Sequence, residues 1–151
     1  MNKRILWIED DYYAIKGLVR PLEKAGFEVD AATSAIDGFN KALHWEQYDL
    51  IVVDLILPIS NDNKPVPEKV SAWQKEEHVG VGILKWLLVE LKVTRPILLL
   101  TVVRNSAQAY KLDSLGLAGY LPKRGLLPSQ VKTEVFRLLG INSAAPDAIR
   151  L

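Results

Sequence analysis

Five short apolar runs divide the chain at fairly regular intervals and predict five β-strands. Three of the runs are apolar without interruption, among them Leu50-Ile51-Val52-Val53, and strands buried on both faces have this pattern. Such strands are typical of a parallel sheet covered by helices on either side. The expected strands are Arg4–Ile8, Phe27–Ala31, Asp49–Val53, Pro96–Leu100 and Ala118–Leu121.

Between these runs, apolar residues recur at helical spacing. Gly26 follows the first helical segment as a C-terminal cap would, and Ser34 with Asp37 resembles a capping box. Pro21 lies inside the first segment, where we expect a kink and no break. Alternating strands and helices predict a doubly wound α/β fold. The expected helices are Tyr12–Ala25, Ala35–Trp45, Ile83–Lys92, Ser106–Leu115 and Ser129–Leu139.

Residues 59–79 break this alternation. The segment is polar at first and contains two prolines, and its second half, Glu68–Glu77, predicts a short helix with Val70 and Trp73 on one side. A loop this long inside a compact domain is usually functional or disordered. We favour a disordered or loosely packed flap over a dedicated binding element.

Composition narrows the class of protein without identifying it. The 151 residues suit one domain, and the net charge of +1 gives no general reason to expect binding to nucleic acid or a membrane. Cysteine is absent, which excludes disulfides and thiolate chemistry. The histidines His44 and His78 favour solvated or structural roles. With no apolar stretch long enough for a signal peptide or a membrane span, we expect a cytosolic protein.

Polar residues follow four of the predicted strands at the edge where open α/β sheets carry their sites. They are Glu9-Asp10-Asp11, Asp54, Thr101 and Lys123. Any one of these could be a helix cap or an ordinary loop residue. Together, the carboxylates call for a hard cation such as Mg²⁺ or Mn²⁺, and the lysine and hydroxyl suit phosphoryl transfer.

In these motifs the chain resembles the receiver domain of bacterial response regulators, the phosphoacceptors of two-component systems. The matching segments are Ile5–Asp11, Tyr48–Pro58, Leu98–Thr101 and Gly119–Lys123. The resemblance implies a flavodoxin-like strand order 2-1-3-4-5 with helices on both faces. It also implies one domain over residues 1–140, with an inserted loop at about 59–80 and a short C-terminal tail over 141–151.

The resemblance assigns a role to each site residue. Asp54 would be the nucleophile that takes a phosphoryl group from a histidine kinase or a phosphotransfer protein. Glu9, Asp10, Asp54 and the backbone carbonyl of Ile56 would hold Mg²⁺ or Mn²⁺. Lys123 would pair with the phosphoryl group, and Thr101 with Tyr120 would form the switch that a partner reads.

Several positions depart from the family pattern. Val102 stands where a small residue is usual, and Ile56 and Val103 are apolar where polar side chains can assist an attacking water. We therefore expect slow self-dephosphorylation of Asp54. Arg124 replaces a proline that usually has a cis bond, which makes the placement of Lys123 an open question. The connection from Pro58 to Gly82 is much longer than the family's loop, either as a flap or recognition element or as a tolerated surface insertion.

Three alternatives remain beside an active receiver. A degenerate receiver would keep the fold as a phosphorylation-independent interaction module. A phosphatase of the haloacid dehalogenase type lacks its second aspartate, since that position is Ile56. A flavodoxin-like cofactor binder is disfavoured because Glu9-Asp10-Asp11 would repel phosphate.

We expect a stand-alone receiver that is not a turnover enzyme. It would be a monomer or weak homodimer that acts on an unknown protein target, with no nucleic acid or membrane partner.

Overall fold

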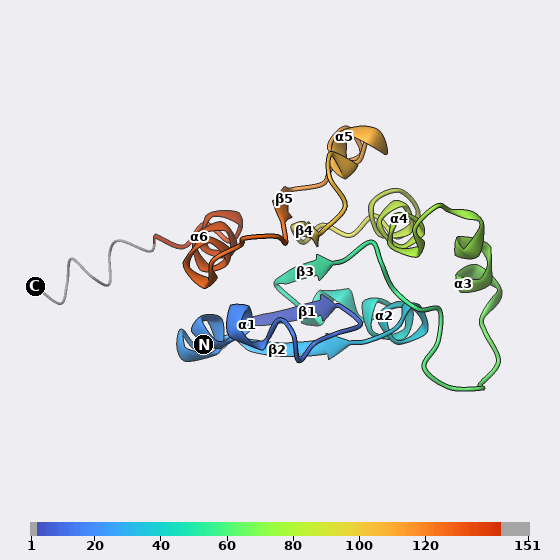
Figure 1. The fold of residues 1–151 in the computed structure, drawn as a ribbon, viewed down its shortest axis with the longest axis horizontal. Coiled ribbons are helices and arrows are strands. Elements are labelled where there is room, and N and C mark those ends of the chain that lie inside the picture. Colours follow the sequence, from blue (N-terminus) through green and yellow to red (C-terminus); the bar gives the residue numbers. More distant parts are fainter. Residues whose placement is uncertain (1–2, 143–151) are drawn as a thin grey trace, which may run out of the picture.

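The computed structural model describes residues 3–142, which form a five-stranded parallel sheet in the order β2-β1-β3-β4-β5 (Figure 1). This confirms the expected fold class and strand order. The observed bounds differ from the predicted ones by at most one residue at either end. The strands are β1 (Arg4–Ile8), β2 (Glu28–Ala32), β3 (Leu50–Val53), β4 (Ile97–Thr101) and β5 (Gly119–Pro122).

Alternate residues of the central strands face two separate cores. On one face Ile51 and Val53 pack with the helices α2 (Ala35–Ala42) and α4 (Val79–Lys85). On the other face Leu50 and Val52 pack with α1 (Lys16–Lys24) and α6 (Pro128–Leu138). All four residues of β3 are fully buried, which is why this run shows no polar alternation in the sequence.

The helix predicted over Ser129–Leu139 is confirmed within one residue as α6, but the first two helices are shorter than the apolar spacing predicted. The first begins at Lys16, because residues 11–15 form hydrogen-bonded turns held by the side chain of Asp11. It then runs through Pro21 without a break, as expected. The helix expected over Ala35–Trp45 ends early, at Ala42. Its predicted N-terminal cap is present, since the Ser34 hydroxyl accepts from the Asp37 amide at 3.1 Å.

Two further helix predictions were wrong in extent. The helix expected over Ser106–Leu115 is only α5 (Ser106–Ala109), since Lys111 adopts a positive φ of 55° that ends regular helix. The helix expected over Ile83–Lys92 begins earlier, as α4, and continues as a π-helical turn, η3 (Trp86–Glu90).

The inserted segment is packed, and the expectation of a disordered or loose flap is wrong for its second half. It contains α3 (Glu68–Ala72) and the 3₁₀ turn η2 (Trp73–Lys75), which lie beside α4 at the end of the molecule away from α6 (Figure 1). Val70 and Trp73 are buried in the core. Trp73 and Trp86 lie 5.6 Å apart between ring centroids, and Phe39 on α2 contacts both rings.

The ends of the chain limit two of the sequence expectations. Of the tail expected over 141–151, positions 143–151 lie outside the described residues. Within residues 3–142, no helix combines the length and apolar character that crossing a membrane requires.

Candidate functional site

Three carboxylates meet at the carboxyl edge of the sheet. Glu9 follows β1 and Asp54 follows β3, and these strands are neighbours, so their ends bring both side chains to one place. Together with Asp10 they can offer one oxygen each within 4.8 Å of one another. Glu9 and Asp54 are buried, with 1% and 4% of their surface exposed, whereas Asp10 is exposed.

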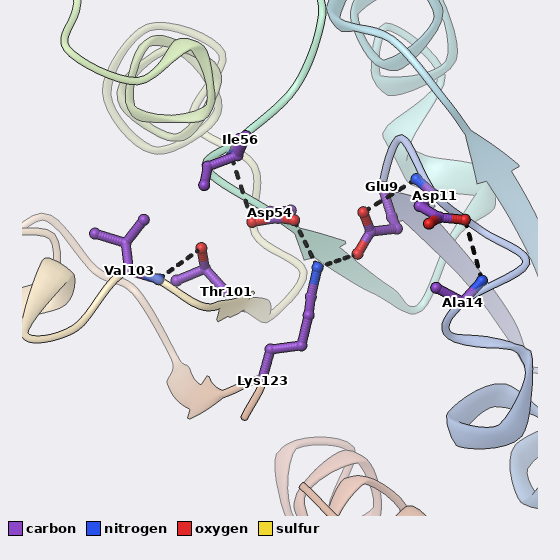
Figure 2. A network of polar contacts seen from close by, with 8 residues as sticks. All are labelled: Glu9, Asp11, Ala14, Asp54, Ile56, Thr101, Val103 and Lys123. Atoms are coloured by element: carbon purple, nitrogen blue, oxygen red, sulfur yellow. Dashed lines mark hydrogen bonds and ion pairs between the residues drawn. The ribbon is translucent and has the colours of Figure 1, made fainter. Parts of the chain in front are cut away.

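Lys123 provides the cation of this cluster. It follows β5, and its Nζ donates to Asp54 Oδ2 at 2.7 Å and to an oxygen of Glu9 (Figure 2). The backbone amide of Lys123 donates to the carbonyl of Thr101 at 2.8 Å, which extends the β4–β5 pairing to the site. The peptide bond between Lys123 and Arg124 is trans, and it places the lysine at the site without the cis bond usual in the family.

One lysine does not balance three carboxylates. Burial, the neighbouring Asp10 and the charge on Asp54 raise the pKa of Glu9 to about 7, against the opposing effect of Lys123. Although its own burial acts the other way, hydrogen bonds to Asp54 and Glu9 raise the pKa of Lys123. The lysine therefore stays protonated, and the carboxylates of the cluster still outnumber the positive charges beside them.

A pocket of about 510 Å³ opens onto these groups. Its polar floor contains Glu9, Asp10, Asp11, Asp54 and Lys123, and its apolar walls include Ile15, Leu18, Ile56, Val102 and Leu126. Ile56 and Val102 keep 46% and 37% of their surface exposed. The pocket at Asp54 therefore includes exposed apolar surface beside its charged groups.

The backbone after Asp54 turns back toward its side chain. The amide of Ile56 donates to Asp54 Oδ1 at 3.3 Å, opposite the bond from Lys123 to Oδ2 (Figure 2). Both oxygens of the carboxylate are thereby oriented before any ligand arrives.

Thr101 and Tyr120 lie beside the cluster and share a partner in Val103. The buried Thr101 hydroxyl accepts from the Val103 amide at 3.3 Å, and the Tyr120 hydroxyl donates to the Val103 carbonyl at 3.1 Å. Within the described chain, no hydrogen bond joins Thr101 to Asp54. The structure therefore brings Glu9, Asp10, Asp54 and Lys123 together and leaves Thr101 bound to its own loop.

The donor set fits a hard divalent cation. Carboxylate oxygens in excess of the neighbouring positive charge, with no imidazole or thiol among them, are what Mg²⁺ or Mn²⁺ prefers. Glu9, Asp10 and Asp54 would hold it, with the carbonyl of Ile56, whose residue lines the same pocket. These ligand roles stay a prediction.

Sequence reasoning missed the contribution of Gly80 and the particular role of Asp11. Asp11 belongs to the predicted acidic segment, and its amide donates to Glu9 at 3.2 Å while its side chain accepts from the Ala14 amide at 3.2 Å, which orders the turn after β1. Gly80 contacts the backbone of Asp54 and Leu55 from the end of the inserted segment. A glycine at a helix start carries no sequence signal for such a contact.

Known proteins similar to this chain are regulators. It is 32% identical over 120 residues to "Probable transcriptional regulatory protein SilR" of Salmonella typhimurium and 31% identical to "Transcriptional regulatory protein CusR" of Escherichia coli K12. Each match covers 80% of this chain and 44% of the relative, so the chain spans less than half the length of these proteins. No family model matches the chain.

Solved structures with the same fold are receiver domains. A response regulator receiver domain protein of Methanospirillum hungatei superposes with a TM-score of 0.68 at 20% identity, covering 93% of this chain and 95% of that one. The non-phosphorylated HemR receiver domain of Leptospira biflexa gives 0.67 at 22% identity, covering 93% and 96%. A receiver domain protein of Clostridium thermocellum gives 0.67 at 18% identity, covering 91% and 94%.

Proposed function

Because the chain has the receiver-domain fold of response regulators, we propose that it accepts a phosphoryl group on Asp54 and signals through the change that follows. One observation carries the proposal. The Asp54 carboxylate is buried, oriented by Lys123 and the Ile56 amide, and open to a pocket that also contains Glu9 and Asp10.

The transfer needs an in-line approach to Asp54. A carboxylate oxygen attacks phosphorus, the bond from phosphorus to the donor's histidine nitrogen breaks, and an acyl phosphate forms on Asp54 while the donor imidazole leaves. The contact of Lys123 with Asp54 Oδ2 supports the proposal that Lys123 pairs with an oxygen of the transferred group. A divalent cation held by Glu9, Asp10 and Asp54 would neutralise the charge that collects in this buried site.

The expected switch follows from the bonds of Val103. A phosphoryl oxygen on Asp54 would accept a hydrogen bond from the Thr101 hydroxyl, and a movement of Thr101 toward it would draw the hydroxyl oxygen away from the Val103 amide, from which it now accepts. Movement of Thr101 would disturb the loop that contains Val103, whose carbonyl accepts a hydrogen bond from the Tyr120 hydroxyl. Thr101 and Tyr120 are thus the residues through which we propose that phosphorylation alters the surface after β4.

The proposed donor is a histidine kinase or a histidine phosphotransfer protein, and the proposed reader is a protein partner. The similar proteins SilR and CusR are named as transcriptional regulatory proteins. The chain matches only part of those proteins, so regulation of transcription would be a property of a whole protein that includes such a receiver.

The test is intact-protein mass after incubation with Mg²⁺ and acetyl phosphate, beside the variant Asp54→Asn. We expect a gain of one phosphoryl group that requires Mg²⁺ and is absent from the variant. A folded wild-type protein that gains nothing would contradict the proposal.

A degenerate receiver is the second candidate, and the pocket entrance favours it. The exposed Val102 and Ile56 both line the pocket at Asp54, and neither offers a polar group to an incoming phosphoryl group. In that case the unphosphorylated surface would bind its partner directly, and Asp54→Asn would leave partner binding unchanged.

A further inference from the structure

The inserted segment returns to the sheet through a glycine that touches the phosphoacceptor loop. Gly80 lies in the first turn of α4 and is buried. A Cβ atom placed on it would lie 2.3 Å from the carbonyl oxygen of Asp54 and 2.5 Å from the Cα of Leu55. Both distances are far inside van der Waals contact, so only glycine allows this close approach of two backbones.

A hydrogen bond fixes the same contact. The Gly80 amide donates to the Leu55 carbonyl at 2.9 Å, and two residues after Asp54 the Ile56 amide turns back to the Asp54 carboxylate. The loop of residues 54–56 is therefore held between its own strand and the start of α4.

Neither neighbour of this loop can yield easily. On one side, β3 pairs with β1 and β4, and its residues are fully buried. On the other side, Val81, Ile83 and Leu84 fix α4 in the core. A side chain at position 80 would therefore transfer its strain to residues 54–56.

We propose that Gly80 is a positioning residue for the phosphoacceptor loop: it holds Asp54 and the Ile56 carbonyl in the arrangement that binds the cation and accepts the phosphoryl group. This inference rests on the proposed function. It gives the inserted segment a role at the site through its docked end, whatever its exposed loop does.

Gly82 offers a matched control on the same helix. A Cβ atom there would lie 2.5 Å from Cδ1 of Trp73, a similarly severe clash whose nearest atoms all belong to Trp73 and not to residues 54–56. The variants Gly80→Ala and Gly82→Ala should both be destabilised, because both overpack a buried contact. Only Gly80→Ala should also alter the site.

The experiment measures two quantities for each variant, at a temperature where that variant is folded. The first is the Mn²⁺ affinity, from electron paramagnetic resonance of free Mn²⁺, and the second is the rate of phosphorylation by acetyl phosphate. Disturbing groups that support metal ligands typically costs about 10–100-fold in affinity. We expect Gly80→Ala to weaken Mn²⁺ binding at least about tenfold relative to Gly82→Ala. The acetyl phosphate rate at saturating metal should also be lower for Gly80→Ala.

Equal Mn²⁺ affinities in the two variants would overturn the inference. A wild-type protein that binds Mn²⁺ but takes no phosphoryl group would contradict the proposed function, while a tenfold difference between the variants would still support positioning of the cation site.

A second measurement uses the wild-type protein alone and does not depend on a variant folding. In an amide NMR titration with Mg²⁺, the Gly80 resonance should shift with the same apparent Kd as that of Ile56, and the Gly82 resonance should shift less. A Gly80 resonance that stays fixed while Ile56 shifts would count against the contact.

Discussion

Two clusters of carboxylate and lysine in this protein differ in how well their charges are balanced. In the first, which we call the edge cluster, Asp30 on β2 accepts from Lys41 at 2.8 Å and from the Tyr48 hydroxyl at 2.5 Å. In the second, the site cluster of Glu9, Asp54 and Lys123, one lysine serves two buried carboxylates. The edge cluster gives one acid two side-chain donors, whereas the site cluster gives two acids one side-chain donor.

The pKa shifts follow this difference. Although partial burial acts the other way, Lys41 and Tyr48 hold the pKa of Asp30 below its ordinary value. Burial and two neighbouring carboxylates raise the pKa of Glu9 to about 7. The edge cluster pairs its carboxylate with donors of this chain, while the site cluster has more carboxylates than its one lysine can neutralise. An excess of buried carboxylates over neighbouring cations, with the raised pKa that results, thus distinguishes the candidate site from an ordinary structural ion pair.

The largest expected effect on stability comes from removing the lysine of the site cluster. Lys123→Met leaves two buried carboxylates without a cationic partner, and we expect a loss of about 3 kcal/mol in the free energy of unfolding at pH 8 without metal. Mg²⁺ should restore part of this loss. Urea unfolding with and without Mg²⁺ measures both.

Lys41→Met is the matched control for that experiment. Lys41 is about one-third exposed, so its loss should be smaller, about 1 kcal/mol, and insensitive to Mg²⁺. The comparison between the clusters fails if Mg²⁺ stabilises both variants equally.

A smaller effect is expected from pH. The pKa of Glu9 is about 7 in the folded protein and has an ordinary value of 4.5, so the folded state binds a proton that the unfolded state releases between these values. Stability without metal should therefore rise as pH falls from 8 to 5, by about 2 kcal/mol after allowance for coupling to Lys123.

Two controls assign that pH dependence to the cluster. Saturating Mg²⁺ should flatten the rise, because the cation favours ionised Glu9, and Glu9→Gln should abolish it. Asp30 acts in the opposite sense: its pKa is lowered, so its contribution is present above its ordinary value of 3.8 and is lost at more acidic pH. Thermal unfolding across pH 3–8 would detect both the contribution of Glu9 and that of Asp30. A wild-type stability that stays constant from pH 8 to 5 would show that the pKa of Glu9 is not raised by folding.

Neutralising one acid in each cluster should change stability in opposite directions. Asp30→Asn weakens two hydrogen bonds from Lys41 and Tyr48, and we expect a cost of about 1 kcal/mol. Asp54→Asn removes a charge from an overcharged cluster and should raise stability without metal at pH 8 by a similar amount. Denaturant unfolding of the two variants in the same buffer checks the signs; destabilisation by both would mean that Asp54 is already neutralised well enough by Lys123.

The strands and the charged residues at their ends could be predicted from sequence because both are local signals. A run such as Leu50–Val53 is apolar since it is buried on both faces, and Asp54 directly follows it. Parallel strands end at one edge, so Glu9, Asp54 and Lys123 had to lie near one another once the sheet was predicted.

The contacts of the inserted segment could not be predicted in the same way. Its polar, proline-containing first half favoured a flap, but burial of Val70 and Trp73 depends on the partner rings of Phe39 and Trp86, which are distant in sequence. The role of Gly80 likewise depends on which backbone lies opposite it. Helix ends were misjudged for a related reason, since apolar spacing around Lys111 cannot reveal its positive φ.

The smallest expected effect concerns water at the site cluster. The exposed Ile56 and Val102 flank the approach to Asp54, and neither can orient a water molecule by hydrogen bonding. We expect a slowly hydrolysed acyl phosphate, and Val102→Ala should speed its loss about threefold, less than 1 kcal/mol of barrier, by opening the entrance.

The decay of phosphorylated protein after removal of the donor, followed by intact mass, measures this rate. Leu127→Ala serves as a control, because Leu127 is exposed but does not line the pocket. If wild-type phosphoprotein decayed within seconds, the apolar entrance would not protect the acyl phosphate. The contrast between the clusters would then be one of charge alone.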